Sequence, residues 1–212
     1  ILHSDISYHG KLLGSASITA SKEVHFKYPS IPNTHSFKFN NISSVKEKIS
    51  SFRKESGESD VYALIIEPFS AGNIRACDTK FLQELQKVCN KNGIVLIFDE
   101  IYVGWYKTGN RFNFMDHDVI PDILTTSKSL GGGKSSISAY VSRESILKKA
   151  YGNIRDATLH TTTYSGMGEE CITALEAINI MEEENYREKS LRIEKTTKLR
   201  CERLIDRFPD EI

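Results

Sequence analysis

Short apolar runs and an amphipathic stretch alternate through the middle of the chain. Residues 61–66 and 94–98 are continuous apolar runs of the kind found in buried strands, and residues 79–92 between them have the period of a helix. The apolar stripe of that helix consists of Phe81, Leu82, Leu85 and Val88, and Gly93 follows as its stop. A right-handed crossover makes the two strands parallel, so the pattern predicts an α/β fold with a mostly parallel sheet flanked by helices.

Weaker patterns predict further elements on both sides of this unit. Strands are expected at residues 1–7, 123–126 and 137–142, a loop at 29–41, and helices at 43–58, 144–151 and 169–185. We expect the last helix to continue, with a kink, through residues 188–208.

Candidate chemistry lies where the predicted strands end. Glu67 follows the first apolar run, Asp99 follows the second, and Lys128 follows the strand at 123–126. Open α/β sheets bind ligands in the crevice beyond the carboxyl ends of their strands, so we expect these three side chains to reach one pocket. Three glycines at 131–133 then allow positive φ angles and a close approach of the backbone to a ligand.

Composition limits the classes of function. The chain has 212 residues, 39% of them hydrophobic, with 28 basic and 28 acidic residues, which is typical of a soluble globular protein and gives no electrostatic reason to bind nucleic acid or a membrane. No apolar run reaches membrane-spanning length. The four cysteines are widely spaced without a CxxC pair, which favours a reducing cytoplasm over disulfides or a metal site.

Four features together resemble the pyridoxal 5'-phosphate (PLP) site of class III aminotransferases. They are the strand end at Asp99, the strand end at Lys128, Pro121-Asp122 before the second of these strands, and the glycine run. This is the fold-type I group that contains the ornithine, acetylornithine and GABA aminotransferases. Five motifs follow the family's order from Tyr8 to the region of Glu184. The resemblance implies the large domain of a fold-type I PLP-transferase, without the upstream phosphate loop of its N-terminal segment and without the C-terminal small domain.

The resemblance also implies a reaction. Lys128 would form a Schiff base with PLP, and Asp99 would pair with the pyridine nitrogen of the cofactor. An amino group would then pass from an amino acid or amine donor to a keto acid or aldehyde acceptor. Glu67, in the family's Glu-Pro motif, would help form the substrate pocket, although Ser70 replaces the Gln usual in that motif.

Four more cofactor-binding residues follow from the resemblance. Tyr8 and His9 stand in the family's aromatic-His-Gly motif, where the aromatic ring stacks on the pyridine; from the residues alone, Tyr8 could equally be core. Tyr102 replaces a Gln that contacts the phenolic oxygen of PLP, so its hydroxyl either donates there or its ring narrows the pocket. Thr163 would bind the cofactor phosphate in the partner subunit, or else its loop caps the following helix.

The resemblance implies that the chain has two parts and that it forms a homodimer. We expect residues 1–185 to be the central part of the PLP-binding large domain, and residues 186–212 to be a helical segment leading toward a C-terminal domain. The chain begins without an initiator Met, directly in strand-like sequence, and stops at residues 209–212 without a closing element, so we interpret it as the middle of a longer polypeptide. A homodimer with shared active sites is expected, because Thr163 would serve the other subunit.

Other functions remain open at this point. An aminomutase or a racemase of the same fold would use the same Lys128 and Asp99, and a non-catalytic dimerisation scaffold would need neither. A P-loop NTPase is a remote alternative, suggested by Gly133-Lys134-Ser135. Its GxxxxGK[ST] loop requires glycine at the position of Lys128, and its loop should lead into a helix rather than the strand expected at 137–142.

Overall fold

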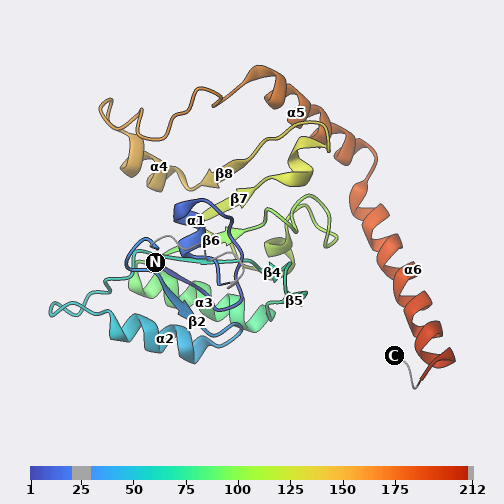
Figure 1. The fold of residues 1–212 in the computed structure, drawn as a ribbon, viewed down its shortest axis with the longest axis horizontal. Helices are drawn as coiled ribbons and strands as arrows, with labels where there is room; N and C mark the ends of the chain where they lie inside the picture. The colour runs from blue at the N-terminus through green and yellow to red at the C-terminus, as the bar shows by residue number, and fades with distance from the viewer. Residues whose placement is uncertain (21–29, 210–212) are drawn as a thin grey trace.

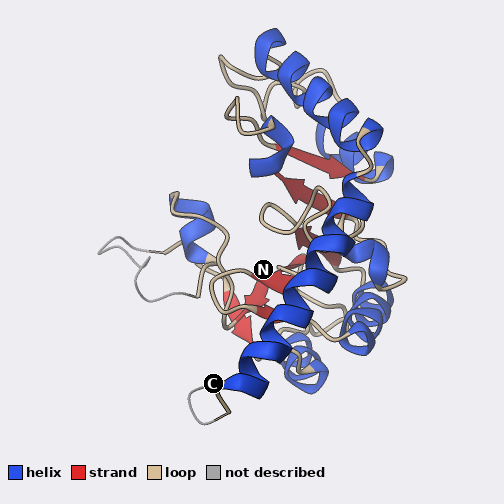
Figure 2. Cartoon of the chain, turned by 90° about the vertical axis from the view of Figure 1, so that its right-hand side faces the viewer, coloured by secondary structure: helices blue, strands red, loops and turns tan. Residues whose placement is uncertain are grey.

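A computed structural model describes residues 1–20 and 30–209, and it has the predicted α/β architecture (Figure 1). Within this part of the chain, six strands form a sheet in the order β2-β1-β3-β6-β7-β8, in which β8 is antiparallel to β7 and all other neighbours are parallel. The strands are β1 (Leu2–Ser4), β2 (His35–Phe37), β3 (Ala63–Ile66), β6 (Val95–Asp99), β7 (Ile123–Thr126) and β8 (Ala139–Ser142). A side view shows them in one twisted layer with helices packed against it (Figure 2).

The strand-helix-strand unit at the centre of the sheet confirms the hydrophobic pattern. Helix α3 (Thr79–Asn92) ends at Gly93, whose φ of 67° is the left-handed conformation that glycine adopts at little cost. It returns the chain so that β3 and β6 pair in parallel, from Ala63 opposite Val95 to Ile66 opposite Phe98. Helix α2 (Ile42–Ser51) packs beside α3 (Figure 1).

The main core lies between the strands and the pair α2 and α3. Its most deeply buried members are Leu2, Phe37, Val45, Leu64, Ile66, Leu82, Leu85, Leu96 and Phe98. These side chains come from β1, β2, β3, β6 and both helices, so apolar burial fixes the relative positions of the strands. The strand ends are therefore held in register.

Two predictions for the N-terminal half were wrong in detail. The expected loop at 29–41 contains β2, which pairs in parallel with β1 and buries Phe37; Pro29 itself lies outside the described residues. A strand of three residues is too short to show an apolar period. The helix expected at 43–58 ends at Ser51, and the rest of the expected segment contains a turn in which the Gly57 N–H donates to the Lys54 carbonyl at 2.9 Å.

Several short elements had no sequence signal strong enough to predict them. They are helix α1 (Leu13–Ser17), the hairpin of β4 (Phe69–Ser70) and β5 (Arg75–Ala76), and the 3-10 helices η2 (Asn113–Asp116) and η3 (Lys128–Gly131). The hairpin follows Glu67-Pro68 directly, where the sequence departs from the family motif.

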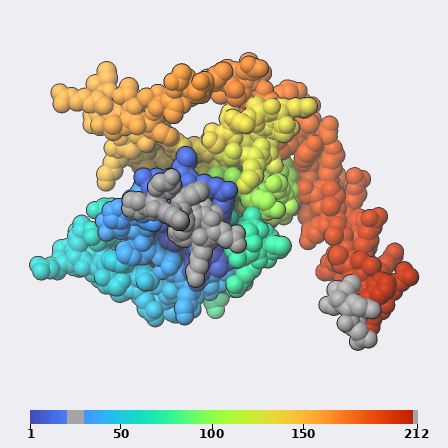
Figure 3. All heavy atoms as spheres, in the orientation of Figure 1, coloured from blue at the N-terminus to red at the C-terminus, as the bar shows by residue number. Residues whose placement is uncertain are grey.

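The C-terminal third consists of α4 (Glu144–Tyr151), α5 (Gly168–Glu183) and α6 (Tyr186–Arg207). The expected kink lies at Asn185, which has a φ of 48°. In the space-filling view α6 extends as an arm along one side of the molecule (Figure 3). Of the helices in residues 1–20 and 30–209, none combines the length and the apolarity needed to cross a membrane.

The surroundings of Lys134 argue against a P-loop. Gly133, Lys134 and Ser135 lead into β8 and not into a helix, so their backbone N–H groups do not form the phosphate-binding start of one. The remote alternative of a P-loop NTPase is therefore wrong, because this loop does not lead into the helix that a P-loop requires.

Candidate active site

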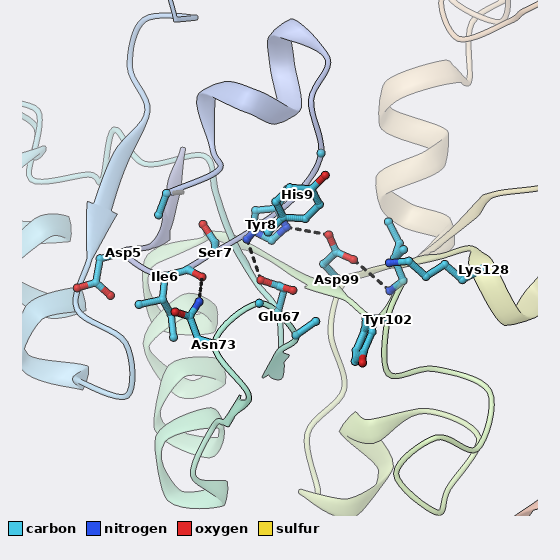
Figure 4. Close-up of a pocket in the computed structure, with 15 residues that line it drawn as sticks. Asp5, Ile6, Ser7, Tyr8, His9, Glu67, Asn73, Asp99, Tyr102 and Lys128 are labelled. Carbon is cyan, nitrogen blue, oxygen red and sulfur yellow. Dashed lines mark hydrogen bonds and ion pairs between the residues drawn. The ribbon is translucent and has the colours of Figure 1, made fainter. Parts of the chain in front are cut away.

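Three neighbouring parallel strands bring Glu67, Asp99 and Lys128 to one cavity, as the sequence predicted. Glu67 follows β3, Asp99 is the last residue of β6, and Lys128 comes two residues after β7 as the first residue of η3. All three line a cavity of about 800 Å³, and Figure 4 shows Asp99 and Lys128 on one side of it and Glu67 farther along. The wall also includes Tyr8, His9, Asn73 and Tyr102.

Asp99 is held at its place by two donors. Its Oδ2 atom lies 2.7 Å from Nδ1 of His9, and its Oδ1 atom accepts the backbone N–H of Ile101 at 3.1 Å. Both the His9 and Asp99 side chains are buried, with 2% and 7% of their surface exposed. The proton of the imidazole therefore lies on Nδ1, facing the carboxylate, and the buried Nε2 atom has no hydrogen-bond partner in the described part of the chain.

Tyr8 lies at the cavity mouth and is connected to Glu67. Its backbone N–H donates to Oε2 of Glu67 at 2.8 Å. Burial raises the pKa of the Glu67 carboxyl and Asp99 adds to this rise, while the Tyr8 N–H and His9 oppose it. The Tyr8 side chain is 40% exposed, so it is not a core residue and its ring is available to a ligand.

Lys128 occupies a strained position. Its φ of 49° is left-handed, which costs a residue with a β-carbon about 1 kcal/mol or more. The local structure holds it there, because the Ser127 hydroxyl donates to the carbonyl of Ile137 at 2.8 Å and the Leu130 N–H donates to the carbonyl of Ser127 at 3.1 Å. This turn directs the Lys128 side chain back toward Asp99 (Figure 4).

The glycine run after Lys128 packs against a helix. At Gly132, with a φ of 59°, a β-carbon would lie 2.9 Å from the β-carbon of Ala177 on α5. Glycine is required there for both reasons, its φ and the close approach of α5. The run therefore joins the Lys128 segment to α5.

Tyr102 lies next to Lys128. Its ring lines the cavity and is 43% exposed, and the Lys128 Nζ atom lies 5.4 Å from the ring centroid. A second ammonium, that of Lys107, lies 4.6 Å from the same centroid. Both distances are within the range of cation–π attraction.

Thr163 does not join this cavity. It lies in the exposed segment between α4 and α5 and is absent from the residues that line the Asp99–Lys128 cavity. The alternative that its loop caps α5 is wrong, because the N-cap residue of α5 is Met167 and no side chain accepts a hydrogen bond there. The proposed contact of Thr163 with a partner subunit stays a prediction.

Sequence reasoning missed two residues that shape the site. Glu100 is fully buried, and its carboxylate accepts the N–H groups of Asn113 at 2.6 Å and Phe114 at 2.8 Å. Burial raises its pKa to about 7. Trp105 donates from Nε1 to the hydroxyl of Thr126 at 2.7 Å and so ties the segment after Asp99 to the end of β7. The pair Asp99-Glu100 was the only sequence signal for Glu100. Trp105 stands at an aromatic position of the family pattern, which predicts no hydrogen-bond partner for its Nε1 atom.

The described residues contain no cluster of three or more His, Cys, Asp or Glu side chains that could hold a metal ion. Cys77, Cys89, Cys171 and Cys201 are free thiols.

The sequence is similar to that of known aminotransferases over most of its length. The family model "Aminotransferase class-III" matches residues 1–211. An acetylornithine aminotransferase from Nostoc sp. is 33% identical over 189 residues, which cover 87% of this chain and 42% of the relative. The chain thus spans less than half the length of that curated relative.

Solved structures of transaminases share the fold. An amine transaminase from an uncultivated Pseudomonas species, solved in its PLP-bound form, superposes with a TM-score of 0.86 at 22% identity, covering 97% of this chain and 50% of that one. An ornithine aminotransferase from Toxoplasma gondii gives 0.80 at 21% identity, covering 92% and 43%. The sheet is thus that of a fold-type I transaminase, and the chain belongs to the class III aminotransferase family.

Proposed function

We propose that the protein of which this chain is a part is a PLP-dependent aminotransferase, which transfers an amino group from an amino acid or amine donor to a keto acid or aldehyde acceptor. The observation that carries the proposal is the placement of Asp99 at the end of β6 and of Lys128 just after the adjacent strand β7, both facing one cavity (Figure 4). The relatives support it, since those named are an acetylornithine aminotransferase, an ornithine aminotransferase and an amine transaminase.

The residues present fit PLP. A cavity of about 800 Å³ is in the size range of small-molecule sites and has room for the cofactor together with a small substrate. Asp99 is a buried carboxylate fixed by two donors, and Lys128 offers a primary amine on the same wall. Tyr8 presents an exposed aromatic ring at the mouth.

PLP, when bound, supplies an aldehyde for amines and a pyridine ring that withdraws electrons from the substrate carbon. With PLP bound, Asp99 would hold a proton at the pyridine nitrogen, and His9, which lies against the Asp99 carboxylate, would keep that carboxylate oriented. The exposed ring of Tyr8 would be available to pack on the face of the pyridine, and Tyr102 would stay beside Lys128. The Lys128 amine would take the proton from the substrate carbon and deliver it to the C4′ carbon of the cofactor, acting first as general base and then as general acid.

Glu67 belongs to the substrate side of the cavity in this proposal. Its pKa, raised by burial, leaves it sensitive to the charge of a ligand that enters. We assign residues 1–185 to the PLP-binding large domain and residues 186–212 to the helical connection toward a C-terminal domain. The described part of that connection is α6, and residues 210–212 lie outside the described residues.

Assembly and location complete the proposal. We propose a homodimer in which Thr163 binds the cofactor phosphate of the partner's site, which the exposure of its loop supports. A cytoplasmic location is supported by four free thiols, two of them buried in the fold without a disulfide.

Reductive trapping tests the central assignment. Borohydride should fix the pyridoxyl group of the full-length protein on Lys128, and peptide mass spectrometry should find it there. The Lys128→Ala variant should lose the label, while Lys134→Ala, six residues farther on and outside the cavity, should keep it. A pyridoxyl group on Lys134 in the wild-type protein would overturn the proposed function.

A further inference from the structure

Lys107 lies beside the proposed site without a role in the reaction described above. Its ammonium is 4.6 Å from the centroid of the Tyr102 ring, and the Lys128 ammonium is 5.4 Å from the same centroid. Within the described residues, neither lysine forms an ion pair with a carboxylate. The ammonium groups of both lysines therefore lie close to the same aromatic ring, that of Tyr102.

Two strained residues bring Lys107 to this place. Trp105 and Tyr106 have φ angles of 62° and 68°, and consecutive left-handed residues with side chains are costly. The surroundings hold both: Trp105 donates to Thr126, and the Tyr106 hydroxyl donates to Glu182 of α5. Strain that the fold maintains in this way points to a positional requirement, and its local result is that Lys107 lies over Tyr102.

Apart from the Tyr102 ring, the surroundings of Lys107 disfavour its positive charge. Burial lowers the pKa of the Lys107 ammonium, and the nearby Lys128 charge lowers it further. The negative face of an aromatic ring offsets such a cost when an ammonium lies within about 6 Å of it. Attraction to the Tyr102 ring thus keeps the Lys107 ammonium at this position.

Lys107 does not line the Asp99–Lys128 cavity. It lines a separate groove together with Trp105, Ser129 and residues of α5 and α6, while Tyr102 lines the cavity with Lys128. An effect of Lys107 on the chemistry must therefore pass through Tyr102 or through space as a charge. These two routes can be told apart.

We propose that Lys107 is a positioning residue: it fixes the ring of Tyr102 by cation–π attraction, and the fixed ring holds the Lys128 side chain in its reactive orientation. The inference rests on the proposed function of Lys128. Tyr102 stands where the family has a Gln, so the pair of Lys107 and Tyr102 is a feature of this chain's own residues.

Substitutions in the full-length enzyme test the proposal. Lys107→Met keeps the length of the side chain but removes its charge, and should lower kcat about threefold to tenfold with little change in KM. Lys107→Arg keeps a cation that stacks on aromatic rings and should restore kcat to within about twofold of the wild type. In a Tyr102→Leu background, Lys107→Met should have no further effect, because the ring that transmits it is gone.

A second readout uses the cofactor-free protein. Limited acetylation followed by peptide mass spectrometry measures the reactivity of Lys128 relative to Lys134 in the same sample. Lys107→Met should raise this ratio about threefold, since a mobile Tyr102 ring no longer holds the amine, and Lys107→Arg should not. This ratio is independent of transamination, so it separates a failure of the positioning role from a failure of the proposed function.

Two results would overturn the proposal. One is a Lys107→Met enzyme with wild-type kcat and a wild-type acetylation ratio. The other is an effect of Lys107→Met that persists undiminished in the Tyr102→Leu background, which would mean that the Lys107 charge acts on Lys128 directly through space.

Discussion

The part of the molecule up to Leu124 contains the main apolar core, whereas most of the large apolar side chains from β8 to α6 are exposed. Every member of the main core belongs to the first part. In the second part, α4 and α6 have no buried side chain among their described residues, and α5 buries only Ala174, Ala177 and Met181. Large apolar side chains such as Val141, Leu159, Ile172 and Leu175 lie exposed there.

This difference in burial matches the different roles that the two parts have in the proposed enzyme. Glu67 and Asp99 need fixed positions, and they lie at the ends of strands packed into the core. Thr163 lies on the exposed part, where in the proposed dimer its partner is another copy of the chain. An exposed apolar surface of this extent is typical of an interaction surface. The comparison predicts that substitutions in the two parts differ in kind.

The largest effect is expected at Asp99. The Asp99→Asn variant should keep its cofactor but lose about a hundredfold in kcat, because a neutral amide no longer holds the proton at the pyridine nitrogen. Cofactor content by absorbance and steady-state rates measure the two parts of this prediction. Asp118→Asn is a suitable control, since Asp118 is exposed and its φ of 54° suits asparagine equally well. Wild-type turnover in Asp99→Asn would exclude Asp99 from the mechanism.

Stability should respond next most strongly, and differently in the two parts. Leu82→Ala removes a fully buried side chain of α3 and should cost about 3 kcal/mol, from lost burial and the cavity left behind. Leu175→Ala removes a side chain of α5 that is 60% exposed in the described chain and should cost less than about 0.5 kcal/mol. Urea unfolding of this chain measures both.

The same pair can sharpen the comparison in the full-length protein. If Leu175→Ala then costs about as much as Leu82→Ala, the α5 surface is covered there by a domain or a second subunit. Equal costs in the isolated chain would contradict the contrast in burial itself.

The elements that could be predicted are those with a strong local signal, in the buried part and in the exposed part alike. Helix α3, strand β7 and helix α4 have the predicted bounds, because an apolar period and glycine stops act locally. Glu67, Asp99 and Lys128 meet at one cavity because parallel strands end at the same edge of a sheet. Both inferences need only local sequence and one topological rule.

What could not be predicted depends on contacts between distant residues. Strand β2 is short and polar, and it forms because it pairs with β1 and buries Phe37. The contact of Lys107 with Tyr102 depends on left-handed angles at Trp105 and Tyr106, two residues whose types give no signal for that conformation. Asp99 and His9 were each predicted to contact the cofactor, but the contact between them joins residues ninety positions apart, and no local pattern indicates it.

A smaller effect is expected from Glu100, within the buried part. Its pKa of about 7 is above the 4.5 of an unperturbed Glu, so the folded chain binds more protons than the unfolded chain between about pH 4.5 and 7. The free energy of unfolding should therefore fall as the pH rises through that window, by at most a few kcal/mol. Glu67 adds a slope of the same sign, so only a difference between variants isolates Glu100.

Glu100→Gln provides that difference. Glutamine stays neutral at every pH, so the variant should lose much of the decline in stability between pH 5 and 8, as measured by urea unfolding at several pH values. Glu47→Gln, at an exposed position on α2, should keep the wild-type decline. An unchanged slope in Glu100→Gln would show that Glu100 is ionised throughout the window.

The smallest effect is expected at Thr163, on the exposed part, and it tests whether that part serves the site of another subunit. Removing one hydroxyl that donates to a phosphate should weaken cofactor retention about tenfold without unfolding the chain. At a cofactor concentration that leaves Thr163→Ala inactive, mixing it with inactive Lys128→Ala under conditions that exchange subunits should restore activity. In a mixed dimer both defects fall in one site, and the other site has an intact lysine and an intact threonine. If heterodimers form and no activity returns, Thr163 contributes nothing to the partner's site, and the exposed part needs another explanation.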